Sequence, residues 1–141
     1  MSARFFLDTN IFVYCFDRHA RRKAESAQAI VKDAVQSGQG VVSYQVVQEF
    51  LNVALRKFAV PLAAAEATEY VSTVFRPLLA VHSSESLILD ALHLCGRYST
   101  SWYDSLIVAA AVQAECSVLY SEDLDPGLRI GPMRIVNPFA A

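Results

Sequence analysis

Short apolar runs alternate with longer amphipathic segments along most of the 141-residue chain. Apolar runs of a few residues are typical of buried strands, whereas apolar residues spaced three and four apart indicate one face of a helix. The strand candidates are residues 4–7, 41–43, 78–81, 118–120 and 133–136. The helix candidates are residues 27–35, 45–58, 61–76, 84–98 and 102–114. Because strands that alternate with helices form parallel crossover units, we expect a three-layer α/β/α fold with a short, mostly parallel sheet of about four or five strands.

Glycine and proline residues set several of the expected boundaries. Gly38 and Gly40 should end the helix that contains residues 27–35. Pro61 suits the first turn of the helix over residues 61–76, because the missing N–H of a proline has no intrahelical partner there. Pro77 should end that same helix.

Composition limits the class of protein. Hydrophobic residues make up 54% of the chain and charged residues 18%, which excludes intrinsic disorder. The longest unbroken apolar run, Leu106–Val112, is far shorter than the ~20 residues that span a bilayer. The three cysteines form no CxxC pair, and the three histidines have no zinc-ligand spacing. We therefore expect a single domain over residues 1–141, in a soluble protein of the cytoplasm.

Four acidic residues fall where ligands bind in an open parallel sheet, beyond the carboxyl ends of the strands. Asp8 directly follows the first strand candidate, and Asp123 lies just beyond residues 118–120. Asp104 lies in the first turn of a helix that is apolar nearly all round, and Glu49 lies in the first half of the helix over residues 45–58. The sequence thus predicts an acidic cluster at one edge of the sheet.

Each of these residues also has a purely structural interpretation. Asp8 could cap a following helix, and Asp104 could complete a capping box with Ser101. Glu49 could lie on an exposed helix face, and Asp123 could belong to a turn. The combination of all four acids favours a metal-binding site over these structural roles. Converging carboxylates without basic partners repel one another, and a divalent cation relieves that repulsion. Hard oxygen ligands select Mg²⁺ or Mn²⁺, and such ions serve phosphodiester hydrolysis.

The segments around these four acids resemble the PIN-domain ribonuclease family, and in particular the VapC-type toxins of bacterial toxin–antitoxin pairs. The resemblance spans nearly the whole chain and lies in Phe6–Ile11, Val46–Phe50, Tyr103–Ile107 and Leu119–Leu124. It implies a PIN-like fold and an endoribonuclease that depends on Mg²⁺ or Mn²⁺.

The resemblance also implies roles for individual residues. Asp8 and Asp104 would be the principal metal ligands, and Glu49 and Asp123 would complete the acidic quartet directly or through water. Glu122 and Asp123 are adjacent acids, and we prefer Asp123 because it follows Ser121 by two positions, as in the family pattern.

Further implications concern site support and partners. Asn10 and Ser121 match polar positions that support the site. The family implies an RNA substrate and a small antitoxin protein that covers the site. It commonly implies a homodimer, with the helices around residues 45–76 in the interface.

The net charge of −2 argues against a protein that coats nucleic acid, but it allows a local basic patch. Without the four candidate carboxylates, the rest of the chain carries +2. Arg18, Arg21, Arg22 and Lys23 cluster after Asp8 and could bind RNA phosphates, or could form a solvated helix face. Trp102 and Tyr103 could stack on a base, although we expect them to pack in the interior.

Other functions remain open on the sequence alone. A phosphatase of the haloacid dehalogenase type requires a second acid two residues after its nucleophile, where this chain has Asn10. An RNA-processing PIN nuclease outside toxin–antitoxin systems would share the same residues. A non-catalytic RNA-binding or assembly module of the same fold would be indicated by absent metal binding.

Overall fold

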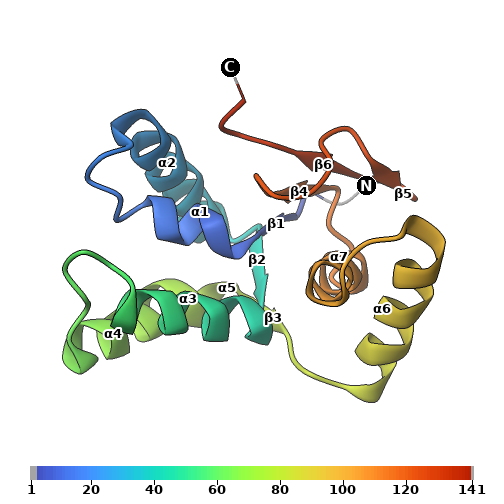
Figure 1. The fold of residues 1–141 in the computed structure, drawn as a ribbon, viewed down its shortest axis with the longest axis horizontal. Coiled ribbons are helices and arrows are strands. Elements are labelled where there is room, and N and C mark those ends of the chain that lie inside the picture. The colour runs from blue at the N-terminus through green and yellow to red at the C-terminus, as the bar shows by residue number, and fades with distance from the viewer. Residues whose placement is uncertain (1–2, 141) are drawn as a thin grey trace.

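The computed structural model describes residues 3–140, which form a six-stranded sheet with helices on both sides (Figure 1). The strands are β1 (Phe5–Leu7), β2 (Gly40–Ser43), β3 (Leu79–Val81), β4 (Val118–Tyr120), β5 (Arg129–Ile130) and β6 (Met133–Val136). The helices are α1 (Thr9–Tyr14), α2 (Arg21–Ser37), α3 (Tyr44–Arg56), α4 (Ala64–Tyr70), the π-helix η1 (Val71–Phe75), α5 (Arg76–Leu78), α6 (Glu85–Tyr98) and α7 (Trp102–Gln113).

The sheet has the strand order β3-β2-β1-β4-β6-β5. Every neighbouring pair is parallel except β5 and β6, which are antiparallel. The predicted α/β class and the mostly parallel sheet are therefore confirmed. Among the strands, only β5 was not predicted, because two residues are too few for a periodic pattern. Among the helices, α1 was not predicted, and α2 begins earlier than the candidate over residues 27–35.

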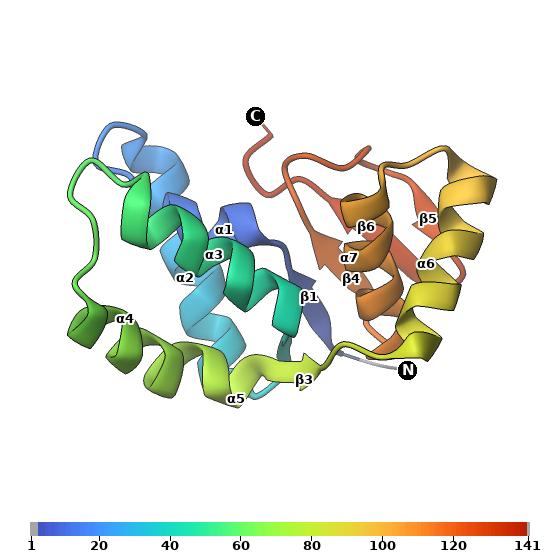
Figure 2. The ribbon, with the colours of Figure 1, turned by 60° about the horizontal axis from the view of Figure 1, so that its bottom comes forward.

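The two groups of helices lie apart from each other (Figure 2). Helices α1 to α5 are on the side of β2 and β3, and α6 and α7 are on the side of β4 to β6. Aromatic rings join the first group, because Phe12 of α1 packs against Phe75 of η1 at 4.8 Å and against Phe50 of α3 at 6.4 Å between ring centroids. Helix α7 is buried as predicted, since Ile107, Val108 and the residues around them contribute to the core.

The ends of α2 and β2 follow the predicted glycines. Helix α2 ends at Ser37, and Gly38 adopts the left-handed conformation with φ of 71°. Gly40 allows close approach of strand and helix, since a Cβ atom at this position would overlap Ala34.

Both proline-based boundaries were wrong. Pro61 lies in the loop before α4. This helix begins at Ala64, because the Glu66 carboxylate accepts a hydrogen bond from N of the N-cap residue Ala63 at 2.9 Å. Pro77 does not end the helical segment, which runs through α4, η1 and α5 to Leu78. The π-helix shifts the hydrogen-bond register directly before Pro77, and a proline is tolerated in the first turn of the new segment.

No helix within residues 3–140 is both long enough and apolar enough to cross a membrane.

Candidate active site

Asp8 lies at the carboxyl end of β1 and is only 6% exposed. One carboxylate oxygen accepts a hydrogen bond from Thr9 N at 2.7 Å and thereby caps α1. The other accepts from Ser121 Oγ, which is fully buried beside β4, at 2.6 Å. Burial raises the pKa of Asp8 to about 6, although both hydrogen bonds lower it; the charges of Glu49 and Asp123 raise it further. Helix capping therefore explains the contact of one Asp8 oxygen only. The carboxylates of Glu49 and Asp123 lie close enough to repel the Asp8 charge.

Glu49 approaches the same place from α3. Its Oε1 accepts a hydrogen bond from Thr9 Oγ1 at 2.8 Å, and its Oε2 lies 3.4 Å from Gln45 Nε2, one turn earlier on the helix. The side chain is half-buried, so the interpretation of Glu49 as an exposed helix residue is wrong.

Asp104 occupies the first turn of α7. Its backbone N–H donates to Ser101 Oγ at 3.3 Å, which forms one half of the capping box considered above. The other half is missing, because within residues 3–140 the Asp104 carboxylate has no hydrogen-bond or ion-pair partner. This carboxylate is half-buried at the edge of the core and remains available to a ligand.

Asp123 belongs to the loop that follows β4. Asn10 Nδ2 donates a hydrogen bond to Asp123 Oδ2 at 3.0 Å, and Asp123 N donates to Ser121 Oγ at 3.2 Å. Asn10 Oδ1 is buried without a hydrogen-bond partner in the described part of the chain. Asn10 and Ser121 thus contact the acids that they were predicted to support.

The adjacent acid Glu122 has a different environment. It accepts a hydrogen bond from Tyr14 Oη at 2.6 Å and forms an ion pair with Lys23 Nζ at 2.6 Å. The hydrogen bonds from Lys23 and Tyr14 lower the pKa of Glu122. Lys23, a candidate RNA-binding residue, is therefore already engaged by a carboxylate.

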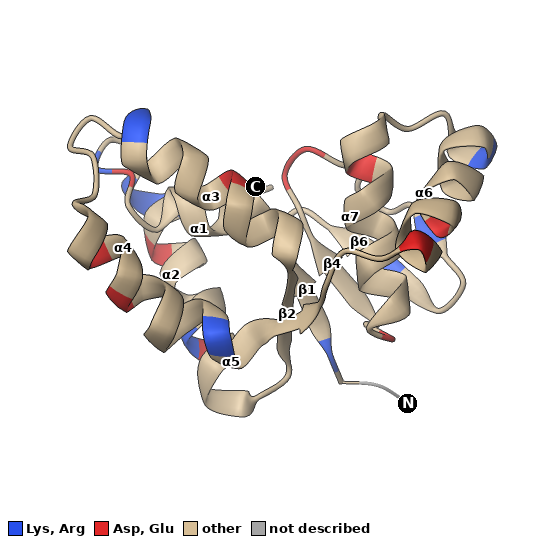
Figure 3. Cartoon of the chain, turned by 90° about the horizontal axis from the view of Figure 1, so that it is seen from below, with Lys and Arg blue, Asp and Glu red and all other residues tan. Residues whose placement is uncertain are grey.

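All four predicted acids line one open cavity of about 470 Å³. Figure 3 shows acidic segments of α3, of α7 and of the loop after β4 at this end of the sheet. Among the described residues that line the cavity there is no lysine or arginine. The remaining lining residues are Thr9, Asn10, Val13, Tyr14, Gln45, Val53, Tyr103, Ile107 and Glu122.

The oxygen donors of the cavity resemble those of a site for one hydrated divalent metal ion rather than those of a closed metal cage. Within residues 3–140, no three Asp, Glu, His or Cys side chains are close enough to hold an ion together. Mg²⁺ does not require such a cage, because it usually keeps several waters and takes one or two carboxylates. A lining of carboxylate oxygens that contains no lysine or arginine, together with the unpartnered Asn10 Oδ1, fits an ion of this kind.

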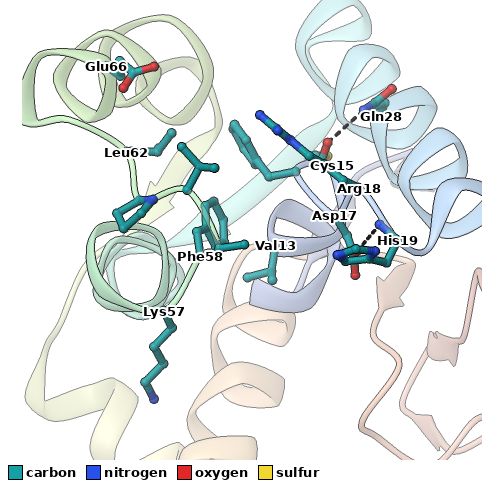
Figure 4. Close-up of a pocket in the computed structure, with 14 residues that line it drawn as sticks. Val13, Cys15, Asp17, Arg18, His19, Gln28, Lys57, Phe58, Leu62 and Glu66 are labelled. Atoms are coloured by element: carbon teal, nitrogen blue, oxygen red, sulfur yellow. Dashed lines mark hydrogen bonds between the residues drawn. The ribbon is translucent and has the colours of Figure 1, made fainter.

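A second cavity of about 620 Å³ lies between the α1–α2 loop and the α3–α4 loop (Figure 4). Arg18 lines it, and Val13 lines both cavities. Arg18, Arg21 and Arg22 are exposed and, within the described residues, have no carboxylate partner. The predicted basic cluster is thus accessible at these three positions.

Sequence reasoning missed three residues of the acidic cavity. Thr9 and Gln45 hold Glu49, and Tyr14 holds Glu122. Tyr14 follows Asn10 by one helical turn, and this spacing could have placed it on the same face of α1. Tyr103 was expected to be buried but is 64% exposed at the cavity, because the first turn of α7 projects beyond the core.

A model of the PIN domain matches residues 5–128, and the chain belongs to this family. Among solved structures, its fold is similar to that of a toxin–antitoxin complex from Klebsiella pneumoniae, with a TM-score of 0.67 and 18% identity over 99% of this chain and 100% of the other. It is also similar to VapC20 of Mycobacterium tuberculosis, described as a sarcin–ricin loop cleaving toxin, with a TM-score of 0.60 and 15% identity over 84% and 91% of the two chains. FitAcB from Neisseria gonorrhoeae gives a TM-score of 0.63 and 16% identity over 97% and 99%. No curated protein sequence matches the chain significantly.

Proposed function

We propose that this protein is an endoribonuclease that depends on Mg²⁺ or Mn²⁺ and acts as the toxin of a type II toxin–antitoxin pair. The observation that carries the proposal is the convergence of Asp8, Glu49, Asp104 and Asp123 on one cavity without a basic residue in its lining. The toxin structures with the same fold support the choice of an RNA substrate, since one of them is described as cleaving the sarcin–ricin loop.

The chain would hold the metal mainly through Asp8 and Asp104, with Glu49 and Asp123 acting directly or through water. When bound, the ion would supply an activated water and stabilise the leaving oxygen of the phosphodiester. The other polar residues orient these acids: Ser121 holds Asp8, Thr9 holds Glu49, and Asn10 holds Asp123.

The RNA would contact the protein through two further features. Arg18, Arg21 and Arg22 are accessible cations that could bind phosphates, while Lys23 is engaged by Glu122. Tyr103 projects at the cavity next to Asp104 and offers a surface on which a base could stack.

We also propose an antitoxin protein and a second copy of the chain as partners. The similar structures include toxin–antitoxin complexes, which supports the first partner. The family resemblance implied a homodimer interface on the helices around residues 45–76, which nothing in the structure tests. The exposed apolar side chains Ile88, Leu89 and Leu92 of α6 offer a different surface that a dimer would cover.

The test is cleavage of a structured RNA by the purified protein with Mg²⁺, with Mn²⁺ or with EDTA. We expect cleavage only with a metal, and a loss of more than ~100-fold in Asp104→Asn, since even the outer-shell partners of a metal typically contribute ~10–100-fold. Asp33→Asn on the exposed face of α2 is the matched control and should cleave normally. Absence of both cleavage and metal binding would reject the enzyme and favour a non-catalytic module.

A further inference from the structure

Three polar side chains beside the acidic quartet form a closed network. Glu122 Oε1 accepts from Tyr14 Oη at 2.6 Å, and Glu122 Oε2 pairs with Lys23 Nζ at 2.6 Å. Lys23 Nζ also donates to Tyr14 Oη at 3.2 Å, so each member contacts the other two. Both oxygens of Glu122 are therefore engaged by strong donors.

The network joins segments that are far apart in the sequence. Tyr14 is the last residue of α1, Lys23 lies in the first turn of α2, and Glu122 lies in the loop after β4. Phe139 packs against the Tyr14 ring at 4.9 Å, and Lys23 Nζ lies 4.7 Å from the centre of that ring. The contacts thus fasten the loop after β4 to the end of α1 and the start of α2.

The same loop carries the residues that contact the quartet. Glu122 stands between Ser121, which donates to Asp8, and Asp123, which accepts from Asn10. A shift of Glu122 would therefore move both neighbours, because consecutive residues of a short turn cannot move independently.

We propose that Tyr14, Lys23 and Glu122 are positioning residues, which hold the turn from Ser121 to Asp123 against α1 and so fix Asp8 and Asp123 for metal binding. This inference rests on the proposed function. It assigns Glu122 a role outside the metal site, although Glu122 lines the same cavity as the quartet. Lys23 balances the charge of Glu122, so that the cavity does not carry a fifth uncompensated carboxylate.

The test must separate positioning from simple attraction between charges. Removal of Lys23 alone would add net negative charge beside the cavity and could strengthen cation binding by itself. We therefore choose the double variant K23M/E122Q, which leaves the net charge unchanged, and Tyr14→Phe, which removes only a hydroxyl. The double variant E25Q/K32M on the exposed face of α2 is the matched control, and Lys23→Arg conserves the charge and the donors.

The measurement is calorimetric titration of the full-length protein with Mn²⁺ in the absence of RNA, together with thermal melting to verify folding. We expect K23M/E122Q to bind Mn²⁺ about tenfold more weakly, by analogy with other outer-shell partners of metals. Tyr14→Phe should weaken binding by a smaller factor, and Lys23→Arg and the control should bind as the wild type does.

Three results would overturn the inference. Wild-type Mn²⁺ affinity in both K23M/E122Q and Tyr14→Phe would show that the network has no positioning role. Glu122 would instead be a ligand if Glu122→Gln lost binding as fully as Asp123→Asn while Tyr14→Phe kept it. Failure of the wild type itself to bind Mn²⁺ would reject the proposed function and, with it, this inference.

Discussion

Asp8 and Asp104 line the same cavity, yet their surroundings differ in almost every respect. Asp8 follows a central strand, is almost completely buried and accepts hydrogen bonds on both carboxylate oxygens. Asp104 begins a helix, is half-buried, and its carboxylate has no partner within the described residues. The folded sheet therefore holds the Asp8 carboxylate in place, whereas no contact among the described residues holds the Asp104 carboxylate.

Of the substitutions that test this difference, Asp8→Asn should change the stability of the metal-free protein most. The pKa of Asp8 is raised from 3.8 to about 6, so the folded state binds the proton more tightly than the unfolded chain does. The stabilisation from this proton is fully present below pH 3.8 and is lost as the pH rises through 6. At pH 7.5 the buried charge therefore costs about 3 kcal/mol relative to a neutral group.

Asp8→Asn removes the charge but also one of the two acceptor oxygens that Thr9 N and Ser121 Oγ use. The stability change that it causes should therefore be more favourable at pH 7.5 than at pH 4 by up to about 3 kcal/mol. Urea unfolding in EDTA at the two pH values measures this difference, with Asp33→Asn as the control. Equal effects at both pH values would contradict the assignment of the cost to the Asp8 charge.

Asp104→Asn, in contrast to Asp8→Asn, should leave the stability of the metal-free protein almost unchanged and should affect only metal binding. Because its carboxylate makes no contacts that the fold requires, we expect the stability of the metal-free protein to change by less than about 0.5 kcal/mol. The stabilisation that the wild type gains from Mn²⁺, about 2.7 kcal/mol at 100 times its dissociation constant, should disappear. Melting curves with EDTA and with Mn²⁺ test both parts, and a variant that kept the Mn²⁺ effect would remove Asp104 from the metal site.

The smallest expected effect is at Tyr103, beside Asp104. Replacement by alanine should weaken RNA binding by about 1 kcal/mol, since one stacked base contributes about 1–3 kcal/mol. Tyr103→Phe retains the ring and should bind as the wild type does. Binding of a labelled RNA in EDTA at constant ionic strength measures the effect, and an equal loss in both variants would indicate the hydroxyl rather than stacking.

The sequence predicted the strand that ends at Asp8 and the buried helix that begins near Asp104, because both follow from local apolar patterns. The parallel order of the strands then placed these acids at one edge of the sheet. The family is confirmed as well, by a match to residues 5–128.

Other features depend on contacts between distant segments, which local patterns do not contain. Glu122 and Asp123 are equivalent acids in the sequence, and only the folded chain brings Lys23 to one of them and Asn10 to the other. The start of α4 depended on the Glu66 carboxylate rather than on Pro61. Tyr103 is exposed because the first turn of α7 extends beyond the neighbouring elements. The helical periodicity of the sequence cannot predict how far a helix extends in this way.

The hydrogen bonds that complete the site join residues that are far apart in the sequence. Asp8 and Ser121 are 113 positions apart, as are Asn10 and Asp123. At synthesis rates of about 5–20 residues per second, Ser121 follows Asp8 out of the ribosome by roughly 6–23 s. A growing chain that contains only β1 to β3 has Asp8 and Glu49 but lacks Asp104 and Asp123. Translation therefore delays assembly of the cluster until residue 123 has been made, so a growing chain that stops short of this residue cannot present the complete set of acids.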